Sequence, residues 1–265
     1  MTALSDLSPV VHAEWVADRL GEDGLVLADV RGPNAHSRAH LPGSIPLVVG
    51  APGQFTDAEV IRAFALEAGL RLRRHGITGD ERLVLYDDGR CVSAAAAAQI
   101  VELAGHPNVA VLAGGLAAWA GEVQSGAVVL EKTRVELEPR LDAVPTREEL
   151  RARLDDPSLT IVDVRRQEEY TGQAGAQCDP RQGHIPGALN VEVTTLFEGP
   201  GLPRPAGEVR ALTALPEDTD VIAYCHSGSR SALATMALRS AGYQARNYLG
   251  SWHEWSRDVS LPGEP

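Results

Sequence analysis

The sequence has few cysteines, no long apolar run and a deficit of positive charge, and each shortage excludes a class of protein. Three cysteines, far apart among 265 residues, do not make a disulfide scaffold, so a reducing, cytoplasmic environment is expected. No stretch approaches the roughly 18 uninterrupted apolar residues of a membrane-spanning helix. The net charge of -12 disfavours binding to nucleic acid or to an anionic membrane surface.

Leader and cofactor signals are also missing. Residues 1–7 lack a basic region followed by an apolar stretch, so no secretory signal is expected. His and Cys residues do not occur at the sequence spacing of metal ligands, and no glycine-rich nucleotide-binding loop is present. We therefore expect no metal and no cofactor. The hydrophobic fraction of 44% is typical of a globular chain that buries one large core or two modest ones.

The chain contains an internal repeat. Four short segments of the N-terminal half recur in the C-terminal half in the same order and with nearly the same spacing. They are residues 26–31 with 160–165, 40–45 with 184–189, 83–87 with 221–225, and 112–119 with 248–255. The second copy has ten extra residues between Arg165 and His184. We predict two homologous domains, 1–122 and 145–265, joined by a linker over 123–144.

Each copy alternates short β-branched runs with Ala/Leu-rich stretches, which predicts an α/β fold with a small parallel sheet flanked by helices. The predicted strands are 25–30, 83–86 and 110–112 in the first copy and 160–164, 221–224 and 246–249 in the second. The predicted helices include 58–68, 93–104 and 231–241. Thr146 and Glu149 form a capping-box signature, and Gly105 and Gly242 stand at helix C-cap positions.

The most informative segment is the run Tyr224-Cys225-His226-Ser227-Gly228-Ser229-Arg230-Ser231. Cys225 follows a short apolar strand, and a helix is predicted to begin close to Arg230. A strand, a short loop and a helix start direct backbone N–H groups and the helix dipole at one point. A sulfur held there is stabilised as a thiolate and can act as a nucleophile. Cys225 is therefore the candidate catalytic residue, and Arg230 is the first candidate to bind an anionic substrate.

Together these motifs resemble the rhodanese family, specifically the tandem-domain sulfurtransferases that use thiosulfate or 3-mercaptopyruvate. The motifs that carry the resemblance are residues 163–165, 183–188, 224–231 and 250–255. It covers nearly the whole chain and implies two rhodanese-like domains, of which the second is catalytic. In the first copy Asp87 takes the place of Cys225. A carboxylate cannot carry a sulfane sulfur, so the first domain is expected to be inactive.

The resemblance also implies a reaction. Cys225 would take the outer sulfur of thiosulfate as a persulfide, and cyanide or a thiol acceptor, with a thioredoxin-like protein among the candidates, would remove it. The substrate-binding residues implied are Arg230, Arg165, His226, Ser227, Gly228 and Ser229. No nucleic acid and no membrane is expected as a partner. Ser227-Gly228 is similar to the loop of mercaptopyruvate-using members, so 3-mercaptopyruvate is the alternative donor.

Several of these residues have a structural alternative. Arg31 repeats Arg165 in the copy without the cysteine, so either a structural role or a substrate-binding role fits Arg165. His184 and His40 also recur in both copies, which favours a structural hydrogen bond. We align Cys91 with Ser229 and expect it to be a small packed thiol. Cys178 lies in the insertion and is expected to be exposed, with a disulfide to Cys225 as a lesser alternative.

Two competing functions are considered. A cysteine phosphatase or arsenate reductase would need five residues between cysteine and arginine, and here four residues separate Cys225 from Arg230. The shorter loop suits one sulfur atom better than a tetrahedral phosphate. A double domain that only docks partners is the second alternative. The retained cysteine and its Gly/Ser-rich loop argue against it, because the first copy shows how such a site changes once it is lost.

Overall fold

The computed structural model describes residues 7–50 and 57–265, and the chain forms two compact units. Unit 1 comprises Met1–Ala51, Arg62–Arg140 and Gly199–Leu202, and unit 2 comprises Pro52–Ile61, Leu141–Glu198 and Pro203–Pro265. The main change of unit, after Arg140, falls inside the predicted linker. Two short segments belong to the unit other than the one that surrounds them in sequence, Pro52–Ile61 to unit 2 and Gly199–Leu202 to unit 1. No sequence pattern indicated this exchange. Residues 1–6, on which the expectation of no leader depends, lie outside the described residues.

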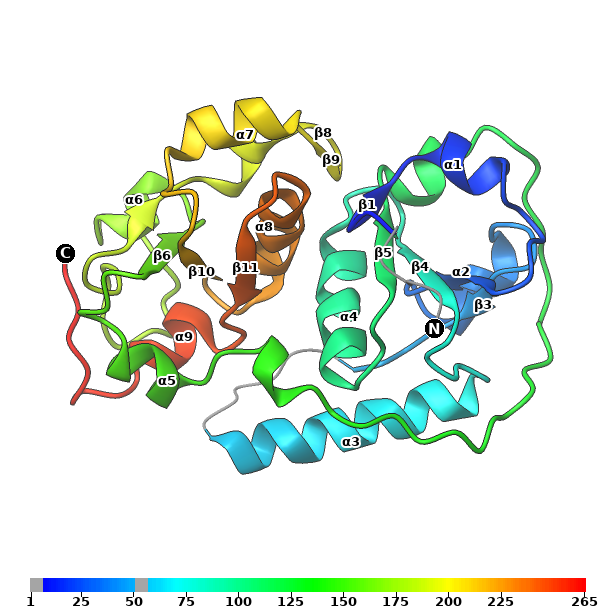
Figure 1. The fold of residues 1–265 in the computed structure, drawn as a ribbon, viewed down its shortest axis with the longest axis horizontal. Coiled ribbons are helices and arrows are strands. Elements are labelled where there is room, and N and C mark those ends of the chain that lie inside the picture. Colours follow the sequence, from blue (N-terminus) through cyan, green and yellow to red (C-terminus); the bar gives the residue numbers. More distant parts are fainter. Residues whose placement is uncertain (1–6, 51–56) are drawn as a thin grey trace. The chain divides into compact units, whose positions relative to one another are not determined.

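Unit 1 is built on a parallel sheet that has five strands among the described residues, in the order β1-β5-β4-β2-β3 (Figure 1). The strands are β1 (Val10–Val11), β5 (Val109–Leu112), β4 (Arg82–Tyr86), β2 (Leu25–Asp29) and β3 (Ile45–Pro46). The helices are α1 (Ala13–Ala17), α2 (Pro33–Arg38), α4 (Val92–Leu103), most of α3 (Ala58–Arg74) and the 3-10 turn η1 (Gly115–Ala118). The parallel order confirms the α/β class predicted for this copy.

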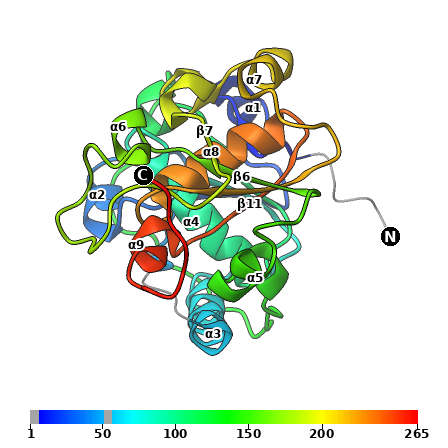
Figure 2. The same ribbon diagram turned by 90° about the vertical axis from the view of Figure 1, so that its left-hand side faces the viewer.

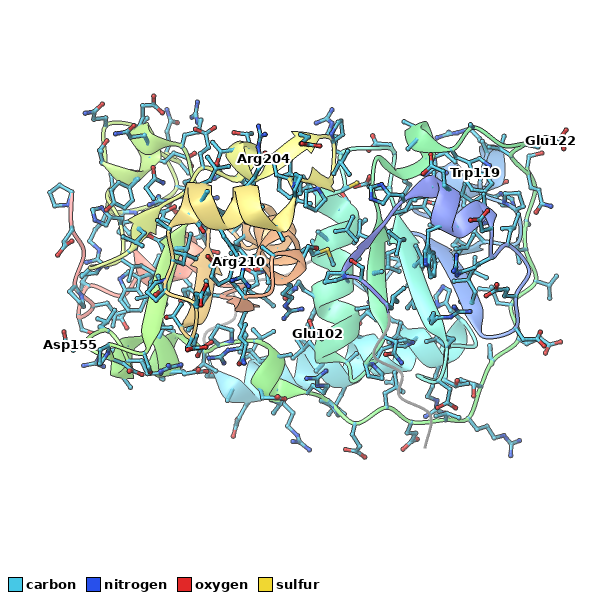
Figure 3. The ribbon with its side chains drawn as sticks, turned by 45° about the horizontal axis from the view of Figure 1, so that its top comes forward. Glu102, Trp119, Glu122, Asp155, Arg204 and Arg210 are labelled. Carbon is cyan, nitrogen blue, oxygen red and sulfur yellow. The ribbon has the colours of Figure 1, made fainter. Side chains whose placement is uncertain are left out.

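The predicted linker is extended and packs on unit 1. Thr133 donates its N–H to the carbonyl of Arg73 at 3.1 Å, and Arg140 donates to the carbonyl of Leu103 at 2.9 Å. Where the first copy ends, Trp119 donates its indole N–H to the carbonyl of Glu122 at 3.0 Å (Figure 3). Main-chain bonds of this kind hold the part of the linker up to Arg140, and the 3-10 turn η2 (Leu141–Ala143) then begins the Leu141–Glu198 segment of unit 2.

Unit 2 is built on a parallel sheet in the order β11-β10-β6-β7, and Figure 2 shows helices on both of its faces. The strands are β11 (Gln244–Asn247), β10 (Asp220–Tyr224), β6 (Leu159–Asp163) and β7 (Leu189–Asn190). The helices are α5 (Arg147–Ala152), α6 (Gln167–Tyr170), α7 (Ala206–Thr213), α8 (Ser229–Ser240) and α9 (Ser251–Trp255), with 3-10 turns η2 (Leu141–Ala143) and η3 (Val193–Leu196). A two-stranded ribbon is formed by β8 (Phe197–Gly199) and β9 (Leu202–Pro203). In Figure 2, α7 and α8 lie on one side of the sheet and α5 and α9 on the other.

The alternation of side chains along β10 decides which face the candidate cysteine belongs to. Val221 and Ala223 are buried in the cluster that contains residues of α7 and α8, whereas Ile222 and Tyr224 are buried with residues of α5 and α9. Because successive side chains of a strand point to opposite faces, Cys225 continues the α8 face, and it is buried in that cluster. The fold thus brings the thiol to the side of the sheet from which α8 starts.

Most predicted elements are confirmed with shifts of one or two residues in their bounds, but the helix predicted at 58–68 continues to Arg74. The strand expected at 246–249 is misplaced, since β11 spans Gln244–Asn247. Thr146 caps α5 by accepting the N–H of Glu149 at 3.0 Å, but the Glu149 carboxylate pairs with Arg246 at 2.7 Å, so we find one half of the predicted capping box. Gly105 and Gly242 follow α4 and α8 with φ of 106° and 90°, the left-handed conformation of a C-cap glycine.

Candidate functional site

Cys225 lies directly after β10 and is held there by its own main chain. Its N–H donates to Oγ of Ser251 at 3.2 Å, and its carbonyl accepts the N–H of Trp252 at 3.1 Å. The hydroxyl of Ser231 lies 3.4 Å from Sγ and 3.1 Å from the carbonyl of Gly228, and it can donate its one proton to either acceptor. Only 1% of Cys225 is exposed to solvent. The sulfur therefore sits in a fixed position with one side-chain donor within reach of it.

The segment from Cys225 to Gly228, which we name the cysteine loop, ends at the start of α8. Ala232 makes the first intrahelical bond, to the carbonyl of Gly228 at 3.0 Å, so the N–H groups of Ser229, Arg230 and Ser231 precede the hydrogen-bonded turns. Gly228 is the N-cap residue, and its φ of 85° is one that side chains rarely adopt. Such helix-start amides favour negative charge, which suits a thiolate or a persulfide.

Arg230 is fixed by Glu169 of α6. Its Nη1 lies 2.8 Å from Oε2 and its Nη2 lies 2.9 Å from Oε1 of that carboxylate. The ion pair with Arg230 lowers the pKa of Glu169 to about 2. The hydrogen bond with Glu169, and then the negative charge of the Cys225 thiolate, raise the pKa of Arg230. Arg166 also approaches Glu169, at 3.4 Å, so one carboxylate lies between two guanidinium groups and the cluster carries a net positive charge.

Arg165 lies in a different environment. Its side chain is 1% exposed and pairs with Asp163, with Nη2 2.6 Å from Oδ2, and the same Nη2 donates to the carbonyl of Gly183 at 2.6 Å. The guanidinium also stacks on Trp252, 5.1 Å from the ring centroid. Burial opposes the charge, yet the ion pair with Asp163 raises the pKa of Arg165. These contacts favour the structural alternative for Arg165.

The first copy repeats this arrangement without the cysteine. Arg31 pairs with Asp29, with Nη2 2.6 Å from Oδ2. The repeated histidines likewise have main-chain partners: His40 Nδ1 is 2.7 Å from the carbonyl of His36, and His184 Nδ1 is 3.0 Å from that of Tyr170. Contacts that recur in both copies serve the fold, which agrees with the structural alternative for both histidines.

The remaining predicted residues of the loop do not all face the same way. Ser227 is exposed and Ser229 is half-buried. The imidazole of His226 is directed to the insertion, where its Nε2 lies 3.1 Å from Oδ2 of Asp179. The structure therefore gathers Cys225, Gly228, Ser229 and Arg230 around the start of α8, while the side chain of His226 joins a second cluster.

In the first copy Asp87 occupies the equivalent position at the end of β4. Tyr86 and Tyr224 occupy equivalent positions, because the main-chain carbonyl of each accepts the N–H of the residue that follows the neighbouring strand. The donors are Val30, at 3.0 Å from Tyr86, and Val164, at 2.9 Å from Tyr224. The Asp87 carboxylate accepts four backbone N–H groups: Oδ1 those of Gly89 and Cys91, both at 2.9 Å, and Oδ2 those of Ser93 at 3.1 Å and Ala94 at 3.4 Å. The loop geometry at this position thus binds an anion through main-chain donors.

The helix starts correct the alignment of Cys91. The first intrahelical bond of α4 runs from Ala95 to the carbonyl of Cys91 at 2.9 Å, and that of α8 runs from Ala232 to Gly228. Cys91 is therefore equivalent to Gly228 and not to Ser229, and both residues are N-caps with positive φ. The sequence alignment was wrong because the first loop is one residue longer, and no sequence signal marks where that residue is inserted.

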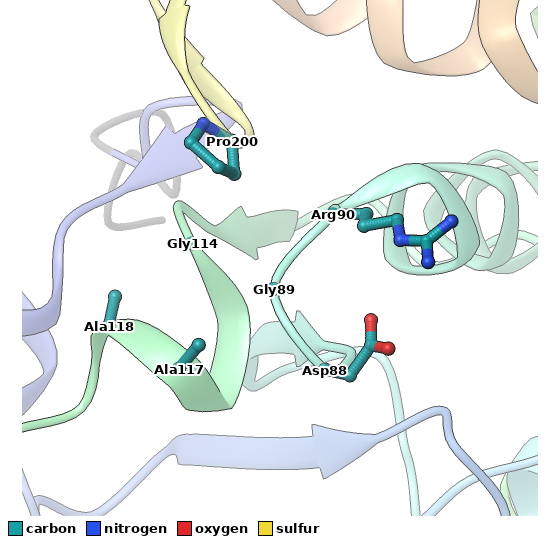
Figure 4. A pocket seen from close by; sticks show the side chains of 7 residues that line it. All are labelled: Asp88, Gly89, Arg90, Gly114, Ala117, Ala118 and Pro200. Carbon is teal, nitrogen blue, oxygen red and sulfur yellow. The ribbon is translucent and has the colours of Figure 1, made fainter.

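Cys91 is a packed thiol, as expected. It is fully buried, its Sγ lies 3.3 Å from the carbonyl of Leu112, and Gly201 packs directly against it. Burial, and then the negative charge of Asp87, raise the pKa of Cys91 to about 12. A hollow of about 440 Å³ lies beside this loop, lined by Asp88, Gly89, Arg90, Gly114, Ala117, Ala118 and Pro200 (Figure 4). The thiol of Cys91 is not among the residues that line it.

Sequence reasoning missed several residues that shape the site. Glu169 and Ser251 orient Arg230 and Cys225, and Asn247 donates its amide to the carbonyl of Gly228 at 2.9 Å. A side chain that acts through one long-range contact leaves no local pattern. Ser231 and Ser251 lie within two of the motifs described above, residues 224–231 and 250–255. Their position close to these motifs is the only sequence signal for their role.

None of the helices in the described part of the chain is long and apolar enough to cross a membrane. The family model for the rhodanese-like domain matches residues 12–122 and 146–258. A thiosulfate sulfurtransferase of Corynebacterium glutamicum is 30% identical over 96% of this chain and 90% of its own, and a 3-mercaptopyruvate sulfurtransferase of Escherichia coli is 27% identical over 96% and 97%. A solved structure described as a probable thiosulfate sulfurtransferase superposes with a TM-score of 0.74 at 32% identity, covering 93% of this chain and 99% of that one. The chain belongs to the rhodanese family and carries two rhodanese-like domains.

Proposed function

We propose that this protein is a sulfurtransferase that moves the outer sulfur of thiosulfate to cyanide or to a thiol through a persulfide on Cys225. One observation carries the proposal. In the first copy, main-chain N–H groups hold the carboxylate of Asp87, and in the second copy the equivalent position presents a cysteine sulfur. An arrangement suited to a fixed anion in one copy suits a thiolate and a persulfide in the other.

The reaction needs two displacements. The Cys225 thiolate attacks the outer sulfur of thiosulfate, a sulfur–sulfur bond forms to Cys225, and the bond to the sulfonate sulfur breaks to release sulfite. Cyanide or a thiolate then attacks the outer sulfur of the persulfide, releasing thiocyanate or a new persulfide and restoring the Cys225 thiolate. Both steps need donors that stabilise sulfur anions, which the amides at the start of α8 and the hydroxyl of Ser231 supply.

The donor is held by the positive cluster around Glu169. Arg230 keeps one orientation because both of its terminal nitrogens bind Glu169, and Arg166 adds a second, exposed cation. A divalent anion such as thiosulfate gains from two nearby guanidinium groups. The main chain of His226, together with Ser227, Gly228 and Ser229, forms the wall of the site in this proposal, and Arg165 holds the end of β6 in place through its ion pair with Asp163.

3-Mercaptopyruvate is the second candidate donor, favoured by the Ser227-Gly228 pair and by the similarity to the Escherichia coli 3-mercaptopyruvate sulfurtransferase. Cys225 again takes the sulfur as a persulfide, but the bond that breaks is the carbon–sulfur bond of the donor, and the leaving enolate takes up a proton to become pyruvate. Cyanide, a small thiol or a thioredoxin-like protein would accept the sulfur. We place the reaction in the cytoplasm, which the three free cysteines support, without nucleic-acid or membrane partners.

Intact-mass measurement after incubation with thiosulfate or with 3-mercaptopyruvate tests the proposal. We expect a gain of about one sulfur atom that cyanide removes and that is absent in Cys225→Ser. The matched control, Cys91→Ser, should still gain the sulfur. If Cys225→Ser still gains a cyanide-labile sulfur, the persulfide is elsewhere and the mechanism is wrong.

The rival functions need a second pair of assays. Hydrolysis of a chromogenic phosphoester that depends on Cys225 would support a phosphatase. Failure to gain sulfur from either donor, with no hydrolysis, would leave the docking module as the better explanation. Sulfur gain without hydrolysis supports the sulfurtransferase.

A further inference from the structure

A cluster of four potential metal ligands lies in unit 2 beside the cysteine loop. Cys178 and Asp179 belong to the ten-residue insertion of the second copy, His226 follows Cys225, and His253 lies in α9. One ligand atom from each residue lies within 4.8 Å of the other three. No sequence pattern indicates this cluster, because its members are far apart in the chain and the insertion has no recognisable motif.

The distances between these atoms resemble the edges of a tetrahedron. Sγ of Cys178 lies 3.9 Å from Nε2 of His226, 3.9 Å from Nδ1 of His253 and 3.8 Å from Oδ1 of Asp179. The same Oδ1 lies 3.0 Å from Nδ1 of His253 and 3.3 Å from Nε2 of His226. Zinc bonds of about 2.0–2.3 Å give tetrahedral edges of about 3.3–3.5 Å, so small side-chain movements would complete the site.

Asp179 provides independent support for a metal site, because one of its carboxylate oxygens has no partner in the described part of the chain. Its side chain is 1% exposed, which is costly for a carboxylate unless its charge is compensated. Among the described residues its Oδ2 has no hydrogen-bond partner, although Nε2 of His226 is only 3.1 Å away. Nε2 of His226 is hydrogen-bonded to the other oxygen, Oδ1, at 3.3 Å, so over residues 7–50 and 57–265 Oδ2 is the atom of this carboxylate that is left without a partner. A metal ion bound to Oδ2 would supply that partner.

Arg257 is the cation that now neutralises Asp179. Its Nη1 lies 3.1 Å from Oδ1 of Asp179 and 2.8 Å from Nδ1 of His253. The same side chain donates to the carbonyls of His253 and Cys178, both at 2.7 Å, and is 35% exposed. A metal ion must displace Nη1 from the two ligand atoms, and the solvent-exposed arginine has room to withdraw.

We propose that Cys178, Asp179, His226 and His253 form a binding site for a divalent transition-metal ion, with Zn²⁺ the best fit. Thiolate, imidazole and carboxylate are its usual ligands, and a four-coordinate tetrahedral geometry is its usual arrangement. The metal would join the insertion, the cysteine loop and α9 at one point. Cys225 is not among the ligands, so the site is separate from the persulfide and does not depend on the proposed reaction.

Cobalt titration tests this site without an activity assay. The Cys225→Ser variant leaves Cys178 as the exposed thiol, so a thiolate-to-cobalt charge-transfer band in the near ultraviolet would report Cys178 as a ligand. Tetrahedral cobalt also gives intense visible bands. We expect both to saturate at one equivalent of Co²⁺ and to be removed by Zn²⁺. The matched control, Cys178→Ser with Cys225→Ser, should lose the charge-transfer band.

Zinc binding to the full-length protein gives a second, independent measurement. By equilibrium dialysis, His253→Gln should bind Zn²⁺ at least about tenfold more weakly than the unmodified protein. Zn²⁺ should raise the unfolding temperature of the unmodified protein and should not raise that of His253→Gln. The unfolding transition of the variant also shows that it is folded. Absence of the cobalt bands, their persistence without Cys178, or equal zinc affinity of His253→Gln would each overturn the proposal.

Discussion

Arg230 and Glu169 form a bidentate ion pair beside the cysteine loop, with nitrogen–oxygen distances of 2.8 and 2.9 Å. A planar guanidinium matches a carboxylate in this way, and an ammonium group cannot. The pairing lowers the pKa of Glu169 to about 2, so both partners stay charged at any pH at which the enzyme would be assayed. The orientation of the positive charge nearest Cys225 therefore depends on one glutamate of α6.

The first prediction concerns this orientation. Arg230→Lys keeps the positive charge but loses one of the two hydrogen bonds to Glu169. The kcat/KM for thiosulfate should therefore fall about tenfold or more, which is a loss of at least about 1.4 kcal/mol of transition-state stabilisation. The control is Arg246→Lys, which alters an arginine of β11 that pairs with Glu149 and Asp220. It should keep its kcat/KM. Equal losses in the two variants would mean that Arg230 contributes only to folding.

The second prediction concerns the loop of the first copy. Asp87→Ala removes the acceptor of four backbone N–H groups in a residue that is 3% exposed. We expect the free energy of unfolding to fall by about 3 kcal/mol, because buried donors then lack partners. Asp88→Ala, at the neighbouring exposed position, should change it by less than about 0.5 kcal/mol. Denaturant unfolding of both variants measures this, and similar values would show that the Asp87 contacts carry little energy.

Much of the second copy could be predicted because its signals are local. The short apolar run Val221-Ile222-Ala223 marks a buried strand, and the Ala/Leu-rich run that follows Arg230 marks the start of α8. The repeat then locates the same elements in the first copy. Cys225 was found because strand, loop and helix follow one another directly in the chain.

The rest could not be predicted because it depends on contacts between distant segments. Glu169 reaches Arg230 across 61 positions in sequence, and Asp179 reaches His253 across 74. Arg165 was ambiguous for the opposite reason. Its motif is clear, but only the structure shows that Asp163 and the carbonyl of Gly183 already bind its guanidinium.

The third prediction uses the N-cap glycine of α8. Gly228→Ala should lose sulfur transfer and destabilise unit 2. The φ of 85° disfavours a side chain, and an added Cβ would lie 2.7 Å from the carbonyl oxygen of Leu249. Gly207→Ala in α7 is the control, since its Cβ would meet nothing within 4 Å, and it should be neutral or slightly stabilising. Thermal unfolding and the thiosulfate assay compare the two, and a Gly228→Ala variant with normal activity would contradict the role given to this backbone.

The fourth prediction concerns Glu254 of α9, a carboxyl that is only 4% exposed. Tyr248 donates to its Oε2 at 2.6 Å, while Oε1 has no hydrogen-bond partner among the described residues. Burial raises the pKa of Glu254 from 4.5 to about 7, and the bond from Tyr248 and the charge of Arg147 oppose the rise, whereas Glu148 and Asp57 add to it. In the folded protein this group therefore keeps its proton to a higher pH than in the unfolded chain.

The sign of the pH dependence follows from this difference. Below pH 4.5 Glu254 is protonated in both the folded and the unfolded state, and its full contribution to the unfolding free energy is present. Between about pH 4.5 and 7 the folded state holds one more proton than the unfolded state. The unfolding free energy should therefore fall as pH rises, by up to about 1.4 kcal/mol per pH unit. Glu254→Gln should remove this decline, whereas Glu168→Gln, at an exposed position of α6, should retain it. Denaturant unfolding of the three proteins from pH 4.5 to 7.5 measures the slopes, and parallel curves for all of them would show that folding does not raise the pKa of Glu254.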